Sequence, residues 1–154
     1  MKVIGKPRRR VDGRAKVTGQ TRFADDIVLP RMLHMRLLRS PHPHALIESI
    51  DVERAKKYPG VHLVLTGKDF PVSFGILPVT QDEYPLAPEH VRYVGDPVAA
   101  VVGKDEQTAS EALDLIEVKY RILPTISSPE EALKIAEPRI HAYSELGTIH
   151  RLQA

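Results

Sequence analysis

The sequence contains no cysteine and no tryptophan, and only 5% of its residues are aromatic. The missing cysteines exclude disulfides, thiol nucleophiles and cysteine-held zinc or iron–sulfur clusters in this chain. A nucleic-acid-binding protein would stack bases on aromatic side chains along a basic stripe, so we expect no nucleic-acid partner. No apolar run approaches the roughly 20 residues of a membrane span. With no secretory signal either, we expect a cytoplasmic protein without a membrane partner.

What remains is the composition of an ordinary globular domain. The chain has 154 residues, of which 42% are hydrophobic and 27% charged, and its formal net charge is +2. This length is sufficient for one domain with its own core. The charges are interspersed except near the start, where Lys6 is followed by the basic run 8–10. Turn signals at Asp12-Gly13 and Thr18-Gly19 then predict a loop-rich lead-in.

Short apolar runs separated by turn residues predict a series of strands. They cover residues 20–24, 33–38, 44–50, 61–65, 91–94, 98–103 and 118–122. Prolines in the bend at 39–43 cannot donate to a strand ladder, so this bend should separate two neighbouring strands at 33–38 and 44–50. From 66 to 90 the periodic pattern is lost and prolines recur, which predicts a long Pro-rich loop.

Capping residues predict short helices at three places. Asp51 precedes a helix to Tyr58, and Ser128 begins a capping box for a helix to about Ala136. The clearest helix follows Asp105, because its apolar residues recur at helical spacing. The alternation of strands and helices predicts an α/β (α+β) domain. It does not fix whether the strands pair in parallel or antiparallel.

The stretch 95–102 is the most informative part of the chain. Gly95 and Asp96 form a turn signal, and the strand that follows carries two consecutive small residues, Ala99 and Ala100. Alanine lets a neighbouring backbone approach more closely than leucine or isoleucine does. We therefore expect this strand to pack either against the helix after Asp105 or against another domain.

Residues in and beside the bend at 39–43 are the main candidates for chemistry. His42 and His44 would lie on one face of an extended segment. A zinc site needs three or four ligands, however, and no Asp, Glu or His at a suitable spacing nearby supplies a third. Hydrogen-bonded or surface histidines are the simpler interpretation. Arg39 would hold an anion or, more commonly, pair with a carboxylate. Ser40 beside the histidines leaves a hydrolase as an alternative, although no turn motif presents the serine.

The loop at 66–90 offers a second alternative. A loop of this length in a compact domain is more often functional or partner-facing than idle. Together with Arg39 it would form an anion or acyl-CoA pocket, which would make the chain a stand-alone small-molecule-binding domain. The adjacent carboxylates at 25–26 and 82–83 lie in predicted loops, and we interpret them as solvated turn residues.

Seven motifs, weak singly but specific in this order, resemble one family. They are Val11-Asp12-Gly13, Lys16-Val17-Thr18-Gly19, Ala24-Asp25-Asp26-Ile27, Leu38-Arg39-Ser40-Pro41-His42, Ile50-Asp51, Pro59-Gly60-Val61 and Gly95-Asp96-Pro97-Val98-Ala99-Ala100-Val101. Together they resemble the N-terminal α/β hammerhead domain of the molybdenum-containing large subunit in the xanthine dehydrogenase and aldehyde oxidase family. Phe74-Gly75-Ile76-Leu77-Pro78, followed by Glu83-Tyr84-Pro85-Leu86-Ala87, is most similar to the 4-hydroxybenzoyl-CoA reductase branch.

The resemblance implies a single hammerhead domain with a mixed sheet, two to three short helices and the long Pro-rich loop. It implies a basic lead-in at 1–19, the domain at 20–146 and a tail at 147–154, after which the molybdenum-binding domains would follow. No catalytic, cofactor-binding or metal-binding residue of the family carries over to this chain. The residues expected at an interface or facing a ligand are Arg39, Ser40, His42, His44, Phe74, Gly95, Asp96, Ala99 and Ala100.

The function that the resemblance implies is structural and docking. Molybdopterin, iron–sulfur clusters and FAD would belong to the complete assembly and not to this chain. The expected partners are the molybdenum-binding domains of the large subunit, an iron–sulfur subunit and a flavin subunit.

Overall fold

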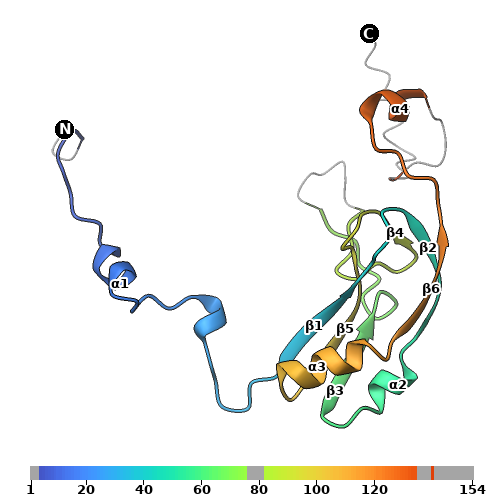
Figure 1. Ribbon diagram of the computed structural model, residues 1–154, viewed down its shortest axis with the longest axis horizontal. Helices are drawn as coiled ribbons and strands as arrows, with labels where there is room; N and C mark the ends of the chain where they lie inside the picture. The colour runs from blue at the N-terminus through green and yellow to red at the C-terminus, as the bar shows by residue number, and fades with distance from the viewer. Residues whose placement is uncertain (1–3, 76–81, 135–139, 141–154) are drawn as a thin grey trace. The chain divides into compact units, whose positions relative to one another are not determined.

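The computed structural model describes residues 4–75, 82–134 and 140, in two compact units, Met1–Met32 and Leu33–Ala154 (Figure 1). The described part of the first unit holds helix α1 (Gly13–Val17) and the 3₁₀ turn η1 (Ala24–Asp26), and none of its residues is buried. The predicted strand at 20–24 is wrong. The Phe23 N–H donates to Asp26 Oδ2 at 2.9 Å, which closes a turn in place of a strand ladder.

The described part of the second unit contains two three-stranded sheets. One has the order β1 (His34–Arg39), β5 (Pro97–Gly103), β3 (Val61–Thr66), and the other β4 (His90–Val91), β2 (Ala45–Asp51), β6 (Glu117–Ile122). All pairings between these strands are antiparallel. The α/β class is therefore confirmed, but two antiparallel sheets replace the expected mixed sheet. Strands β1 and β2 are also not neighbours, because the bend between them carries the chain from one sheet into the other (Figure 1).

Three helices lie among the described residues of this unit: α2 (Glu53–Lys56), α3 (Glu106–Leu113) and α4 (Pro129–Lys134). The predicted cap of α4 is present, and α3 is capped as well. Asp105 Oδ1 accepts the Thr108 N–H at 2.7 Å at the start of α3, and Ser128 Oγ accepts the Glu131 N–H at 3.1 Å at the start of α4. The predicted end of the last helix, at Ala136, lies outside the described residues. No helix in the described parts of the chain is long and apolar enough to cross a membrane.

The main core lies between α3 and the sheet of β1, β5 and β3. Helix α3 contacts β1 and β5 (Figure 1). Small side chains permit this close packing, since Ala99 and Ala109 are both fully buried. The cluster comprises Ala55, Val64, Ala99, Val101, Ala109, Ala112 and Ile116. A second cluster, of Ala45, Ala87, Val91 and Val98, joins the two sheets, because Val98 lies in β5 while Ala45 and Val91 lie in β2 and β4. Ile50 and Val118 pack against both clusters.

The long loop leaves β3 and returns close to its starting point. A Cβ added to Gly67 would lie 2.5 Å from the Ala87 carbonyl oxygen, so only glycine fits there. Farther out, Phe74 and Glu83 exchange backbone hydrogen bonds and form an isolated bridge. Residues 76–81 lie outside the described part of the chain.

Candidate functional site

The bend after β1 and the turn before β5 are joined by hydrogen bonds, and we call this region the junction (residues 39–42 and 92–97). The Gly95 N–H donates to the Ser40 carbonyl at 2.8 Å, and the Ser40 N–H donates to the Asp96 carbonyl at 2.9 Å. Arg39 Nη1 donates to the Gly95 carbonyl at 2.8 Å. Gly95 has a φ of +97°, a conformation that other residues rarely adopt, so the glycine fixes this turn. Arg39 therefore serves the backbone of the junction.

Asp96 closes the turn from inside. The residue is 8% exposed, and its Oδ2 accepts the Arg92 N–H at 2.9 Å. Burial raises the pKa of Asp96, while the hydrogen bond from the Arg92 backbone and the Arg92 charge act in the opposite direction. The buried carboxylate thus acts as a structural hydrogen-bond acceptor.

Ser40 is bonded to the backbone two residues away. Its Oγ donates to the His42 carbonyl and accepts the His42 N–H, both at 3.0 Å, and the side chain is buried. Burial raises the pKa of Tyr120, and a hydrogen bond with Ser40 partly offsets that rise. These contacts occupy the serine in a turn, which argues against the nucleophile that the hydrolase alternative requires.

The two histidines point to different partners. The His42 ring packs edge-on against Tyr120, with ring centroids 5.0 Å apart. His44 is buried, and its Nδ1 lies 3.0 Å from the Pro124 carbonyl oxygen. Within the described ranges, no three His, Asp or Glu residues gather closely enough to hold a metal ion. The His42 ring is thus engaged in packing and the His44 ring in a contact with the backbone.

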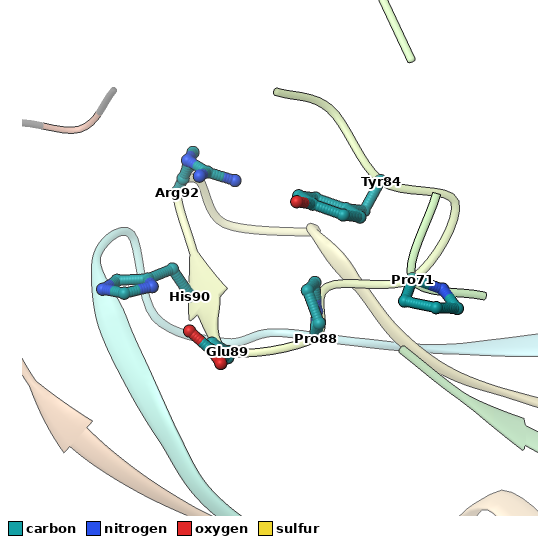
Figure 2. A pocket seen from close by; sticks show the side chains of 6 residues that line it. All are labelled: Pro71, Tyr84, Pro88, Glu89, His90 and Arg92. Atoms are coloured by element: carbon teal, nitrogen blue, oxygen red, sulfur yellow. The ribbon is translucent and has the colours of Figure 1, made fainter. Parts of the chain in front are cut away.

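A cleft of about 270 Å³ lies beside the long loop (Figure 2). It is lined by Pro71, Tyr84, Pro88, Glu89, His90 and Arg92. The Arg92 guanidinium and the Tyr84 hydroxyl point toward one another across it. Arg39, the cation expected for an anion or acyl-CoA pocket, does not line this cleft, and the arginine that does is Arg92.

Neighbouring groups reduce the capacity of Arg92 to bind an anion. Its Nη2 lies 3.7 Å from Asp82 Oδ2, with both side chains only about one-fifth exposed (21% and 22%). Its Nη1 donates to the Asp82 carbonyl and its Nε to the Ile140 carbonyl. Burial, followed by the Arg92 charge, lowers the pKa of His90 and so disfavours its charged form. The cleft therefore offers one arginine whose charge is already balanced by a carboxylate.

The alanines of β5 face opposite sides of their sheet. Ala99 pairs with Leu38 and Thr66 and belongs to the core under α3, as the sequence predicts. Ala100 pairs with Leu37 and Leu65, so its side chain lies on the other face. Residues that pair across an antiparallel sheet share a face, and this second face carries six apolar residues, which we call the far face. They are Met35, Leu37, Leu63, Leu65, Ala100 and Val102.

The structure brings together only some of the predicted residues. Five of the nine lie in the junction: Arg39, Ser40, His42, Gly95 and Asp96. His44 precedes β2, Ala99 and Ala100 lie in β5, and Phe74 is a half-exposed residue of the long loop. Sequence reasoning missed the far face. Its signal is the alternation of Met35 with Leu37 and of Leu63 with Leu65.

The fold has two antiparallel sheets, and the polar side chains of its junction form hydrogen bonds with backbone groups. These features describe a packing module of the α/β class. The chain belongs to the family described as aldehyde oxidase and xanthine dehydrogenase, a/b hammerhead domain, whose model matches residues 18–124. This match confirms the family that the motifs indicate.

Relatives of this chain are much longer proteins. It is 45% identical to a probable xanthine dehydrogenase component of Bacillus subtilis (strain 168), over 90% of this chain and 19% of the relative. It is 39% identical to a xanthine dehydrogenase molybdenum-binding subunit of Escherichia coli O157:H7, over 86% of this chain and 19% of the relative. Among solved structures, quinoline 2-oxidoreductase from Pseudomonas putida 86 superposes with a TM-score of 0.73 at 40% identity, over 85% of this chain and 18% of that one. The chain thus spans about a fifth of the length of these relatives, which are subunits of the molybdenum hydroxylase family.

Proposed function

We propose that this chain is the N-terminal structural and docking domain of a molybdenum hydroxylase-type oxidoreductase and carries no catalytic residue of its own. One observation carries the proposal: the polar side chains of the junction bond to backbone groups of the same chain. Arg39, Ser40 and Asp96 all do so. These three side chains stabilise the backbone of the domain and are not available to a substrate. The family match over residues 18–124 supports the same function.

The proposed assembly contains the molybdenum-binding domains of the large subunit, an iron–sulfur subunit and a flavin subunit, in the cytoplasm. Molybdopterin, iron–sulfur clusters and FAD are assigned to those parts. The sequence supports this division for the clusters, because clusters of this kind are held mainly by cysteine thiolates and the chain has no cysteine. The chain's own contribution is then to present surfaces on which the cofactor-bearing parts pack.

A narrower proposal concerns the reaction. The motif that begins at Phe74 and resumes at Glu83 favours the 4-hydroxybenzoyl-CoA reductase branch, whose enzyme removes the phenolic hydroxyl of its substrate. Phe74 is 49% exposed and is held by its bridge to Glu83, so it is available to a partner or ligand. Residues 76–78 of the motif lie outside the described part of the chain.

Co-purification tests the proposed function. If the reading frame beyond Ala154, or an adjacent frame, encodes molybdenum-domain sequence, the polypeptide that it encodes is the partner to test. We expect the two parts to form a stable complex in size-exclusion chromatography, with molybdenum and pterin assigned to the second part by metal and pterin analysis. Stoichiometric molybdenum in this chain purified alone would show that the proposed division is wrong.

The cleft of Figure 2 supports a second candidate function, a stand-alone domain that binds a small anion or acyl-CoA. Tyr84 supplies an aromatic wall and Arg92 a cation, although Asp82 already balances that charge. Titration calorimetry with CoA thioesters distinguishes the two functions. Absence of binding at millimolar ligand would remove this candidate, and saturable binding that Arg92→Gln abolishes would establish it.

A further inference from the structure

The size of the cleft in Figure 2 limits what it can bind. Its volume of about 270 Å³ lies below the roughly 300–1,000 Å³ of pockets that enclose drug-sized ligands. It therefore has room for a group of a few atoms but not for a whole CoA thioester. The occupant is then a small ion, or one group at the end of a larger molecule.

Arg92 presents an oriented positive charge to this cleft. Its Nε donates to the Ile140 carbonyl at 3.0 Å and its Nη1 to the Asp82 carbonyl at 3.3 Å, so two backbone groups fix the plane of the guanidinium. The Tyr84 hydroxyl points toward the guanidinium from the other side of the cleft (Figure 2). An oxyanion between them would accept a charge-assisted hydrogen bond from Nη2 and a second hydrogen bond from the Tyr84 hydroxyl.

The Asp82 carboxylate competes for the same charge. Its Oδ2 lies 3.7 Å from Arg92 Nη2, whereas charge-assisted hydrogen bonds of this type measure about 2.7–2.9 Å. The carboxylate thus balances the charge of Arg92 through a loose contact. An external oxyanion that reached hydrogen-bonding distance would replace this contact with a shorter and stronger one.

His90 lies among basic groups at the edge of the same cleft. In its sheet, Leu46 pairs with His90 on one side and with Arg121 on the other. Burial, followed by the charge of Arg92, lowers the pKa of His90, and only Glu89 acts in the opposite direction. A bound anion would favour the charged imidazole, so its binding should be coupled to uptake of a proton. The charged and titratable groups that act on His90 are Arg92, Glu89, His44 and Arg121.

We propose that the cleft is a site for a small oxyanion, which displaces Asp82 from Arg92 and binds together with a proton on His90. The inference rests on the second candidate function, because it assigns a class of ligand to the same cleft. The oxyanion is of the sulfate or phosphate type, either a free ion or a phosphate group of CoA. The proposed docking function does not depend on it.

Sulfate is the first probe, because its charge stays constant over the pH range in which histidine titrates. The full chain is titrated with sulfate at about pH 5.5 and about pH 7.5, at constant ionic strength, and binding is followed by NMR. We expect the Kd to be about tenfold or more lower at the lower pH, because the anion and the proton bind together. By the same linkage, sulfate should raise the pKa of His90, as reported by the His90 ring resonances, which are assigned by their loss in His90→Gln.

Asp82→Asn tests the competing carboxylate. Removal of its charge should strengthen sulfate binding by about fivefold or more at the higher pH. Glu83→Gln is the matched control, because it removes the same charge from the next residue, which is exposed and bonds to Phe74 through its backbone. This control should leave the affinity within about twofold of wild type, because solvent and salt screen an exposed charge.

His90→Gln tests the proton. The variant should lose the pH dependence of sulfate binding, whereas His62→Gln, at an exposed position in β3 of the other sheet, should retain it. The NMR spectra of the four variants also report whether each is folded. A pH dependence that survives in folded His90→Gln would overturn the inference.

Titration with CoA identifies the source of the oxyanion and separates the inference from the function on which it rests. Tighter binding of CoA than of sulfate, with the same response to Asp82→Asn and His90→Gln, supports a phosphate group of a larger ligand, and equal binding supports a free ion. Saturable binding of CoA that neither variant changes would overturn the inference while the second candidate function stands. Absence of binding of both probes to wild type and to Asp82→Asn would remove the second candidate function and the inference together.

Discussion

Ala99 and Ala100 are consecutive residues that meet different surroundings. Ala99 is fully buried against the core under α3, while Ala100 lies on the far face and is 2% exposed. We expect Ala99→Leu to lower the free energy of unfolding by about 1–3 kcal/mol, because the added atoms must displace the helix. Ala100→Leu should have a smaller effect, because Ala100 lies outside the cluster under α3 and the added atoms would displace the partly exposed side chains of Leu37 and Leu65, which can move toward solvent.

Urea unfolding of the two variants measures this difference directly. Equal destabilisation would mean that the far face is already packed as tightly as the core. A neutral Ala100→Leu would indicate a surface that is free in the isolated chain.

Asp96 predicts a specific dependence of stability on pH. Burial raises its pKa above the ordinary value of 3.8, so the folded protein holds this proton to a higher pH than the unfolded chain does. The contribution of Asp96 to stability is therefore fully present below 3.8 and is lost as the pH rises through the folded pKa. We expect Asp96→Asn to remove this decrease, as measured by urea unfolding at a series of pH values. Identical pH profiles of variant and wild type would show that the carboxylate does not titrate differently on folding.

At the scale of elements, the N-terminal cap of α3 is the clearest local determinant. Asp105 Oδ1 accepts the Thr108 N–H, and this hydrogen bond lowers the pKa of Asp105. Asp105→Ala should lower the thermal midpoint by about 2–6 °C, whereas Asp105→Asn keeps a capping oxygen and should lower it less. Ser110→Ala, on the exposed surface of the same helix, is the control.

The sign of the pH effect at Asp105 is opposite to that at Asp96. Because the folded pKa is lowered, the stabilisation is present above 3.8 and is lost as the pH falls through the folded pKa. Differential scanning calorimetry in acid should show a shallower loss of stability in Asp105→Asn. An unchanged acid profile in that variant would contradict a charged cap.

The sequence predicts which elements exist better than it predicts how they pair. Strands β1, β2, β3, β5 and β6 all lie within about one residue of their expected ranges, and helix α3 begins directly after Asp105 as expected. Periodicity and terminal charges are local signals, which explains this agreement. Pairing is not local. Apolar alternation tells which side of a strand is buried but not which strand lies beside it, so neither the two-sheet arrangement nor the separation of β1 from β2 was predictable.

The candidate site likewise combines local features that the sequence predicts with long-range contacts that it does not. Gly95 and Asp96 are recognisable as a turn, yet their bonds to Ser40 connect positions more than fifty residues apart and involve backbone atoms. No side-chain pattern encodes such contacts. The far face, in contrast, could have been found from the sequence, had alternate residues of the two outer strands been compared.

At the scale of the whole molecule, the two units differ in what they bury. Both hydrophobic clusters lie within Leu33–Ala154, and no described residue of the first unit is buried. We therefore expect deletion of residues 1–32 to change the thermal midpoint of the remainder by no more than about 2 °C. Deletion through residue 44 removes β1 and should abolish cooperative unfolding. A large loss of stability from the shorter deletion, seen by calorimetry, would show that the first unit contributes to the core.

The near-contact between Gly67 and Ala87 brings the two ends of the long loop together, and the loop's contacts with the body include Leu86, which is buried, and Asp82, which pairs with Arg92. The loop departs from and rejoins the body at one place, so its length can change without displacing either sheet. Each doubling of a flexible loop costs only about 0.6 kcal/mol in closure entropy. This loop can therefore be replaced, in evolution or by protein engineering, while both sheets are retained. A different loop could then accommodate a new neighbour or substrate.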